Sequence, residues 1–498
     1  MKDRPGRVHE WPGGVPVRPL NIAHRGASAH AWENTLHAFE TAARLGADMW
    51  ELDVRLTADG VPVISHDAGL QRVFGADGEI AGLTREQIRT RAPGLPDLDE
   101  IIALARAENQ ALYIEIKASG AGRVAVEHLR RAGFERAVLG SFQAGEVRAL
   151  ADTGCPYPLS VLVRLGDDPF ICAEQSGADI VHLCWEKGGA RPQDLVTGGL
   201  LREAQRRGLG VVLWHEERGD VLADLLELPV LGICTNQPEL IAASDPRRAT
   251  GIQIVCHRGA NHFAPENTMA SARLCYDQGC PYLEVDVRET ADGELVVLHD
   301  PTLDRTTDGK GPVADRTLAE LRELDAGSWF SSFYRGERIP ALREMIALCQ
   351  GYGRKMYIEN KCVDPEKLIA QVEEMNFLDD CFFWSGNPVL QAGLRTVSSR
   401  ANIKSTRRHY KTVPEMVGHL HPMIGEILFE DYAALADDCA LAGVVPMMQY
   451  FGDDPKVFER IAEIAPPMLN LDRADLLFAA MARQEASDGE KRPCPSLT

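Results

Sequence analysis

The chain has 498 residues, of which 45% are hydrophobic and 25% are charged, and its formal net charge is -20. This length favours two domains over one, and the composition is that of a folded protein rather than a disordered one. The negative charge argues against nucleic acid as a partner, because phosphate backbones are bound mainly by lysine and arginine. If the protein acts on a phosphate group, the positive charge that binds this group must therefore be confined to a small site.

Neither the N-terminal residues nor the cysteines indicate a secreted or membrane protein. The first residues lack the apolar core of a secretory signal, and no run reaches the ~18 apolar residues of a membrane span. The twelve cysteines show no C-x-x-C spacing. We interpret them as reduced core residues, as at Cys234, Cys256, Cys275 and Cys349. The expected location is the cytoplasm, and the sequence does not indicate the oligomeric state.

In the first half, short β-rich runs alternate with amphipathic helical stretches such as Thr35–Leu45. The runs are Asn21–Ala23, Trp50–Leu56, Val61–Ser65, Leu112–Ile116, Ala137–Gly140, Leu159–Val163, Ile180–Trp185, Val211–Trp214 and Val230–Cys234. The second and third are joined by too few residues for a crossover helix, so we expect them to form a hairpin. The remaining eight β/α units predict an α/β fold, a TIM (β/α)8 barrel with its site at the carboxyl ends of the strands. An open doubly wound sheet is the alternative.

The chain contains an internal repeat, because Asn21–Asp67 aligns with Ile254–Asp300 without a gap. The matched positions are mostly polar residues or glycine rather than the apolar pattern that a shared fold alone requires. Further on, Tyr113–Lys117 aligns with Tyr357–Lys361. Between these blocks the second copy has extra residues around Ser328–Glu337, which form an aromatic-rich loop. The copies are therefore expected to share their chemistry and to differ in substrate cover.

Five segments are predicted from the repeat and from composition. They are an N-terminal arm at 1–18, a first barrel at 19–245, a linker at 246–251, a second barrel at 252–484 and a disordered tail at 485–498.

Each copy holds three carboxylates that can meet at one end of a barrel. Residues two apart on a strand point to the same face, so Glu51 and Asp53 project together, as do Glu284 and Asp286. With Glu115 in the first copy and Glu359 in the second, each forms an all-oxygen set. Such a set suits a hard divalent cation, Mg²⁺ or Ca²⁺ with Mn²⁺ possible, one per barrel.

The other groups needed to hydrolyse a phosphodiester are also present twice. Arg25 and Lys117, and Arg258 and Lys361, can bind phosphate oxygens. His24 with His66, and His257 with His299, can share acid and base roles near neutral pH. The segments 33–35 and 266–268, both Glu-Asn-Thr, are interpreted mainly as helix N-terminal caps, with support of the site as an addition.

As a set, these motifs resemble the glycerophosphodiester phosphodiesterase family, relatives of phospholipases C with a TIM-barrel fold. The motifs are H-R-G, E-N-T, E-x-D, D-G, H-D and I-E-x-K, and the resemblance covers nearly the whole chain twice. It implies two tandem barrels of the phospholipase C-like type, with a divalent metal on the carboxylates and acid/base catalysis by the histidines. It also implies a small-molecule phosphodiester substrate, with glycerol 3-phosphate and an alcohol as products. The copies depart from each other in places, for example where residues 71–73, Gln-Arg-Val, stand opposite residues 304–306, Asp-Arg-Thr.

Two alternatives stay open at this point. One barrel can be a non-catalytic module that binds a phosphate ligand, because the first copy lacks the aromatic loop. The reaction can also stop at a cyclic phosphate, which makes the protein a lyase.

Overall fold

The computed structural model describes residues 18–245 and 251–491, with side chains as far as residue 484. The chain divides into two compact units, Met1–Asp245 and Pro246–Thr498. Most of the expected arm, linker and tail lies outside the described residues. The last helix, α19, runs from Ala474 to Lys491 and so covers the beginning of the segment expected to be a tail.

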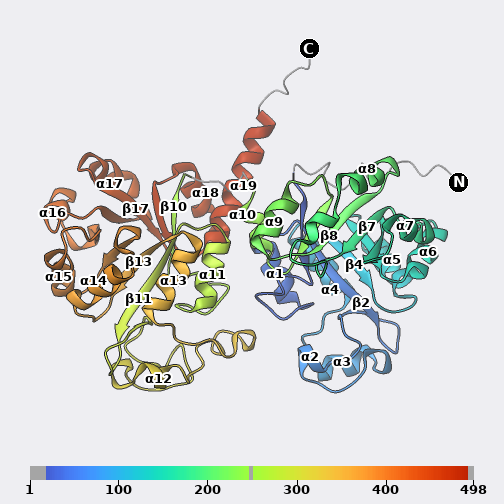
Figure 1. Ribbon diagram of the computed structural model, residues 1–498, viewed down its shortest axis with the longest axis horizontal. Helices are drawn as coiled ribbons and strands as arrows, with labels where there is room; N and C mark the ends of the chain where they lie inside the picture. Colours follow the sequence, from blue (N-terminus) through green and yellow to red (C-terminus); the bar gives the residue numbers. More distant parts are fainter. Residues whose placement is uncertain (1–17, 246–250, 492–498) are drawn as a thin grey trace, which may run out of the picture. The chain divides into compact units, whose positions relative to one another are not determined.

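The first unit is a closed parallel barrel of eight strands with one extra strand, as predicted (Figure 1). Its strands are β1 (Leu20–His24), β2 (Met49–Leu56), β3 (Pro62–Ile64), β4 (Ala111–Ile116), β5 (Ala137–Ser141), β6 (Leu159–Arg164), β7 (Ile180–Cys184), β8 (Gly210–His215) and β9 (Gly232–Thr235). Pairing of β1 with both β2 and β9 closes the ring. The predicted hairpin is confirmed, since β3 pairs antiparallel with β2 through Val54 and Ile64.

Helices alternate with these strands around the first barrel. They are α1 (Leu36–Arg44), α2 (Gln71–Phe74), α3 (Arg85–Arg91), α4 (Leu98–Ala107), α5 (Ala121–Ala132), α6 (Ala144–Asp152), α7 (Pro169–Ser176), α8 (Gly198–Arg206), α9 (Gly219–Leu226) and α10 (Pro238–Ala243). Helix α1 begins where the sequence predicts, because the Thr35 side chain accepts a hydrogen bond from the Ala38 amide and caps it.

The second unit repeats this plan. Its strands are β10 (Gln253–Cys256), β11 (Tyr282–Glu289), β12 (Leu295–Val297), β13 (Lys355–Asn360), β14 (Cys381–Trp384), β15 (Lys404–Thr406), β16 (Ile424–Leu428), β17 (Val445–Tyr450) and β18 (Met468–Leu471). The parallel ladder runs from β14 through β11, β10 and β18 to β15, and an isolated bridge between Phe383 and Ile403 joins its two ends. This barrel is therefore nearly closed, with its weakest seam between β14 and β15.

The helices of the second unit occupy corresponding positions. They are α11 (Met269–Asp277), α12 (Leu318–Leu321), α13 (Leu342–Tyr352), α14 (Pro365–Glu374), α15 (Pro388–Val397), α16 (Val413–Gly418), α17 (Phe429–Leu441), α18 (Pro455–Ile464) and α19. No helix among the described residues has the length and apolar character needed to cross a membrane.

The two barrels fill their interiors differently. In the first, Tyr113 donates to the Ser160 hydroxyl at 2.6 Å, and its own hydroxyl lies 3.1 Å from Nδ1 of buried His182. In the second, a buried Lys404 pairs with Glu426 at 2.6 Å. The group of three in the first barrel and the pair in the second each give hydrogen-bond partners to polar side chains that would otherwise be costly to bury.

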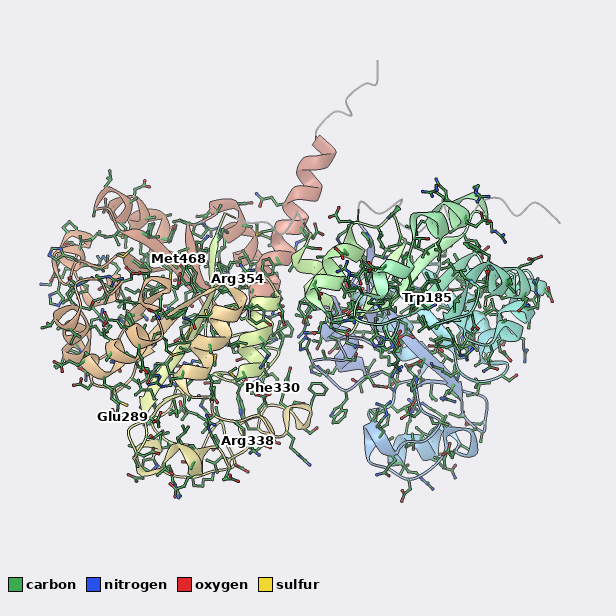
Figure 2. All side chains as sticks on the ribbon, in the orientation of Figure 1. Trp185, Glu289, Phe330, Arg338, Arg354 and Met468 are labelled. Carbon is green, nitrogen blue, oxygen red and sulfur yellow. The ribbon has the colours of Figure 1, made fainter. Side chains whose placement is uncertain are left out.

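A long segment follows the hairpin in each unit and lies beyond the end of β2 or β11 (Figure 1). In the second unit it carries the extra aromatic residues. Phe330 projects from this segment, and Arg338 lies further along it (Figure 2). Tyr334 is buried, and its hydroxyl donates to the Phe263 carbonyl at 2.9 Å, so this aromatic cover is tied to the barrel that bears it.

Candidate functional site

The first barrel gathers three carboxylates at the carboxyl ends of its strands. Glu51 and Asp53 lie on β2, and Glu115 lies on β4 opposite Asp53 in the parallel ladder. All three are buried, and one carboxylate oxygen of each lies within 4.8 Å of the others. The i, i+2 spacing and the neighbouring strand therefore bring together the three residues that the sequence singled out.

The second barrel repeats the cluster with the same register. Glu284 and Asp286 lie on β11, and Glu359 on β13 pairs with Asp286. Their oxygens also lie within 4.8 Å of one another. Glu284 and Asp286 are fully buried, whereas Glu359 is slightly more open to solvent.

Two basic residues partly neutralise the first cluster. The Lys117 ammonium lies 3.1 Å from an oxygen of Asp53 and 2.6 Å from one of Glu115. Nε of Arg25 lies 3.2 Å from the other oxygen of Asp53. Arg258 and Lys361 make the corresponding ion pairs in the second barrel, at 3.5 Å and 2.9 Å from Asp286.

The three carboxyls of the first barrel do not ionise equally. Burial and the charges of Asp53 and Glu115 raise the pKa of Glu51 well above its ordinary value. Burial and Asp53 raise the pKa of Glu115 to about 7. Burial also opposes ionisation of Asp53, but Lys117 and Arg25 outweigh it and lower the pKa of that carboxyl. Three acids share two basic partners, so the cluster is short of positive charge.

The second barrel shows the same imbalance. Burial and the charges of Asp286 and Glu359 raise the pKa of Glu284 well above its usual range. Oε1 of Glu284 is buried and accepts no hydrogen bond in the described structure. A buried acceptor without a partner is costly, and a bound cation removes that cost. The buried all-oxygen sets thus fit a hard divalent cation.

The H-R-G segment turns sharply after the first strand of each barrel. Arg25 and Gly26 both have positive φ, 58° and 82°, and a Cβ on Gly26 would lie 2.7 Å from the carbonyl carbon of Ala38. Glycine is therefore required there. The turn directs the Arg25 amide to Oε2 of Glu51 at 3.0 Å, so the segment also positions a carboxylate.

The first histidine of each barrel is held by the residue that follows the last strand of the same barrel, which pairs with the first strand. Nδ1 of His24 lies 2.8 Å from Oδ1 of Asn236, and its ring stacks on His215 with centroids 4.8 Å apart. Nδ1 of His257 lies 2.8 Å from Oδ1 of Asp472. Burial, followed by the charge of Arg25, lowers the pKa of His24 well below its ordinary value.

The second histidine of each barrel follows the hairpin strand. Nδ1 of His66 lies 2.8 Å from Asp67, and Nδ1 of His299 lies 2.7 Å from Asp300. The guanidinium of Arg55 donates to the His66 carbonyl at 2.7 Å, which ties the residue to β2. The hairpin pairing brings His66 back toward Asp53.

A chain of ion pairs links the H-R-G arginine to the second histidine. Arg25 pairs with Glu33 at 3.1 Å, and Arg72 bridges Glu33 at 2.6 Å and Asp67 at 2.5 Å. Because Asp67 holds His66, the chain runs from one side of the site to the other.

The second barrel contains the same chain. Arg258 pairs with Glu266 at 3.0 Å, and Arg305 bridges Glu266 at 2.8 Å and Asp300 at 2.7 Å. Arg72 and Arg305 thus take the same place, although the sequence comparison counted their segments among the differences between the copies.

The Glu-Asn-Thr segments prove to have both suggested roles. Thr35 caps α1, whereas Glu33 joins the ion-pair chain and Nδ2 of Asn34 donates to Asp53 at 2.8 Å. Asn267 donates to Asp286 at 2.7 Å in the same way. Both asparagines have a positive φ, and this backbone conformation distinguishes them from the threonine that caps the helix. The sequence does not reveal it.

The sequence assigned no role to three further supporting positions in each barrel. They are Arg72, His215 and Asn236 in the first barrel and Arg305, Phe451 and Asp472 in the second. The last pair differs in charge, because an amide holds His24 and a carboxylate holds His257.

A cavity of about 420 Å³ opens beside the first histidine of barrel one. Its lining includes His24, Arg25, His215, Glu217 and Asn236. Polar groups that can exchange protons thus face a space large enough for a small organic ligand.

The fold and this site together define a tandem TIM-barrel protein with a carboxylate, histidine and basic cluster at the mouth of each barrel. The model of the glycerophosphoryl diester phosphodiesterase family matches residues 24–240 and 257–400. The chain belongs to this family.

Individual relatives match one part of the chain at a time. It is 43% identical over 130 residues to a glycerophosphodiester phosphodiesterase of Caldanaerobacter subterraneus, covering 25% of this chain and 54% of the relative. It is 39% identical over 140 residues to one of Bacillus subtilis, covering 26% and 47%. The chain thus spans about half the length of these curated relatives. The crystal structure of a glycerophosphodiester phosphodiesterase from Agrobacterium tumefaciens matches with 39% sequence identity and a TM-score of 0.44. The match covers 46% of this chain and 99% of that one.

Proposed function

We propose that both barrels hydrolyse phosphodiesters of glycerol to glycerol 3-phosphate and an alcohol, with the help of one divalent cation per barrel. The observation that carries the proposal is the repeated site. Each barrel brings three acids, two basic residues and two histidines together with nearly the same contacts. The family membership supports the same reaction class.

Glu51, Asp53 and Glu115 are the proposed metal ligands of the first barrel, and Glu284, Asp286 and Glu359 those of the second. Mg²⁺ or Ca²⁺ fits the all-oxygen sets, and Mn²⁺ is also compatible with them. A bound cation would supply positive charge that stabilises the negative phosphate during reaction.

Arg25 and Lys117 are the proposed phosphate-binding residues of the first barrel, with Arg258 and Lys361 in the second. Each lies beside the carboxylates, and each carries a positive charge into a site that is otherwise acidic. Arginine can bind two phosphate oxygens at once, whereas lysine acts as a point charge.

The paired histidines are the proposed proton carriers. Oδ1 of Asn236 and the carboxylate of Asp67 are both acceptors, so the Nδ1 atoms of His24 and His66 donate to them. Nε2 of each ring is then left with a lone pair. One histidine takes the proton of the attacking oxygen, and the other, once protonated on Nε2, gives a proton to the departing alcohol. His257 and His299 have the same arrangement.

We propose positioning roles for Arg72 and Arg305. Neither is placed against the reacting atoms. Each holds the aspartate that fixes the second histidine, and it anchors the glutamate that holds the H-R-G arginine. Residues of this kind commonly affect rate through the groups they orient.

The two barrels are proposed to accept different alcohol groups. The matching catalytic sets favour activity in both rather than a silent regulatory barrel. The walls differ, because His215 stacks on the first histidine of barrel one and Phe451 on that of barrel two. Only the second unit has the aromatic segment around Trp329 and Tyr334.

The test is an assay of the full chain with glycerophosphocholine, glycerophosphoethanolamine and glycerophosphoglycerol. Each is supplied with Mg²⁺, Ca²⁺ or Mn²⁺, or with chelator alone. We expect glycerol 3-phosphate to form only with metal, and phosphorus NMR distinguishes it from a cyclic phosphate. Absence of metal-dependent turnover of every diester would refute the proposal, and a lasting cyclic product would favour the lyase reaction.

A further inference from the structure

A second group of candidate ligands lies away from the carboxylates, in the wall of the second barrel. Cys256 ends β10, Cys275 lies on α11, and Cys280 lies in the turn from α11 to β11. Their sulfur atoms all lie within 4.8 Å of one another. None of the three side chains is more than 3% exposed, so the group is closed to bulk solvent.

The internal repeat shows that the backbone there does not require cysteine. The corresponding residues of the first barrel are Ala23, Ala42 and Ala47, which are also buried. The turn is the same in both, because the Ala47 amide donates to the Ala42 carbonyl at 3.0 Å and the Cys280 amide to the Cys275 carbonyl at 3.2 Å. On one backbone, three alanines therefore correspond to three thiols that converge on one point.

The surroundings limit which ion this point can hold. In the described part of the chain no histidine or carboxylate joins the three sulfurs, so the set offers three ligands and lacks the fourth that structural zinc sites use. Hydrogen bonding with Cys275 and Cys280, together with burial, raises the pKa of Cys256 well above its ordinary value. Burial, as the largest cause, does the same at Cys275.

Because the three thiols lie in an apolar wall, an ion is disfavoured if its complex with the three sulfurs carries a net charge. Three thiolates around Zn²⁺ or a monovalent copper ion form an anion, which is costly to bury without a nearby cation. A trivalent metalloid differs, since three thiolates neutralise it and three-coordinate geometry completes its shell.

We propose that Cys256, Cys275 and Cys280 form a three-sulfur site for a trivalent thiophilic metalloid, arsenic(III) or antimony(III). Arsenous acid condenses with three thiols, forming three As–S bonds and releasing three waters from its three hydroxyls and the three thiol protons. No oxidant or reductant is needed. The neutral product joins β10, α11 and the turn before β11.

The experiment treats the full chain with arsenite in a non-thiol reductant and follows binding by native mass spectrometry and near-ultraviolet absorption. We expect the mass of one arsenic less three hydrogens, together with a sulfur-to-arsenic absorption band. The variant Cys256→Ala/Cys275→Ala/Cys280→Ala copies the first barrel and should fold, yet lose both signals. Circular dichroism checks that it is folded.

The matched control is Cys381→Ala. Cys381 is equally buried in the second barrel, and its counterpart in the first is Ala137. This variant should keep both signals. The proposal is overturned if the wild-type chain takes up no arsenic under conditions of slow equilibration, if the triple variant binds as much, or if Zn²⁺ or copper occupies the site and arsenite cannot displace it.

Discussion

Arg72→Gln is expected to slow the reaction of the first barrel much more than it weakens the fold. The arginine bridges Glu33 and Asp67, and its side chain is 48% exposed. Ion pairs with this exposure each contribute up to about 1 kcal/mol to the free energy of unfolding. Solvent screening brings the sum of the two pairs to about 1 kcal/mol. For a domain of this size that is a shift of about 2–4 °C in Tm.

The expected loss in kcat is larger, about 10–100-fold, because Asp67 then holds His66 with less constraint. Hydrogen bonding from Arg72 is also the main cause that lowers the pKa of Asp67 to about 2. Removing it raises that pKa, so the acidic limb of the rate profile should move to higher pH.

Kinetics and thermal unfolding are measured in a chain whose second barrel is inactivated by His257→Ala/His299→Ala. The control is Arg89→Gln in the same segment, whose arginine pairs with Asp97 away from the site. An unchanged kcat and pH profile for Arg72→Gln would show that the ion-pair chain has no part in catalysis. A rate equal to wild type in Arg72→Lys would show that charge alone, without the two-pronged contact, is enough.

Three further predictions concern the first barrel. Burial lowers the pKa of His182 to about 3, so the unfolded chain binds more protons than the folded one between about pH 6.5 and 3. Stability should be fully present above about pH 6.5 and fall by up to about 1.4 kcal/mol per pH unit below it, and urea denaturation should show that His182→Gln reduces the slope. Glu51→Gln imitates the protonated carboxyl that burial favours, so the Tm of the metal-free chain should be unchanged or higher. The variant should also lose the stabilisation that metal binding gives to the wild type, which is about 2.7 kcal/mol at a metal concentration of 100 times Kd. Gly26→Ala should cost about 2–3 kcal/mol in thermal unfolding, whereas Gly60→Ala, with similar φ but open space around it, should cost about 1 kcal/mol. Equal costs for the two glycine variants would contradict the steric explanation.

Much of the fold was predictable because its signals are local or repeated. The β/α alternation predicted the barrel, and the short connection before Val61 predicted the hairpin. The i, i+2 spacing brought Glu51 and Asp53 to one face. The repeat then showed that these residues matter together, since unrelated drift would not retain the same polar set.

The supporting residues were harder to predict because their partners are distant or their role depends on backbone geometry. Asn236 meets His24 only when the last strand closes against the first, across most of the barrel sequence. Arg72 sits in a segment whose flanking residues changed between the copies, which hid its match with Arg305. The buried pair of Lys404 and Glu426 has no counterpart of the same chemistry in the first barrel, so the comparison of the two copies could not predict it.

The most direct test of the account compares two double variants of the full chain, His24→Ala/His66→Ala and His257→Ala/His299→Ala. Formation of glycerol 3-phosphate is measured with saturating metal over a panel of diesters. Each variant should keep part of the activity with a different substrate profile, and combining all four substitutions should abolish turnover. If either double variant retains the full activity on every diester, the barrel that it inactivates is not catalytic and the central claim is wrong.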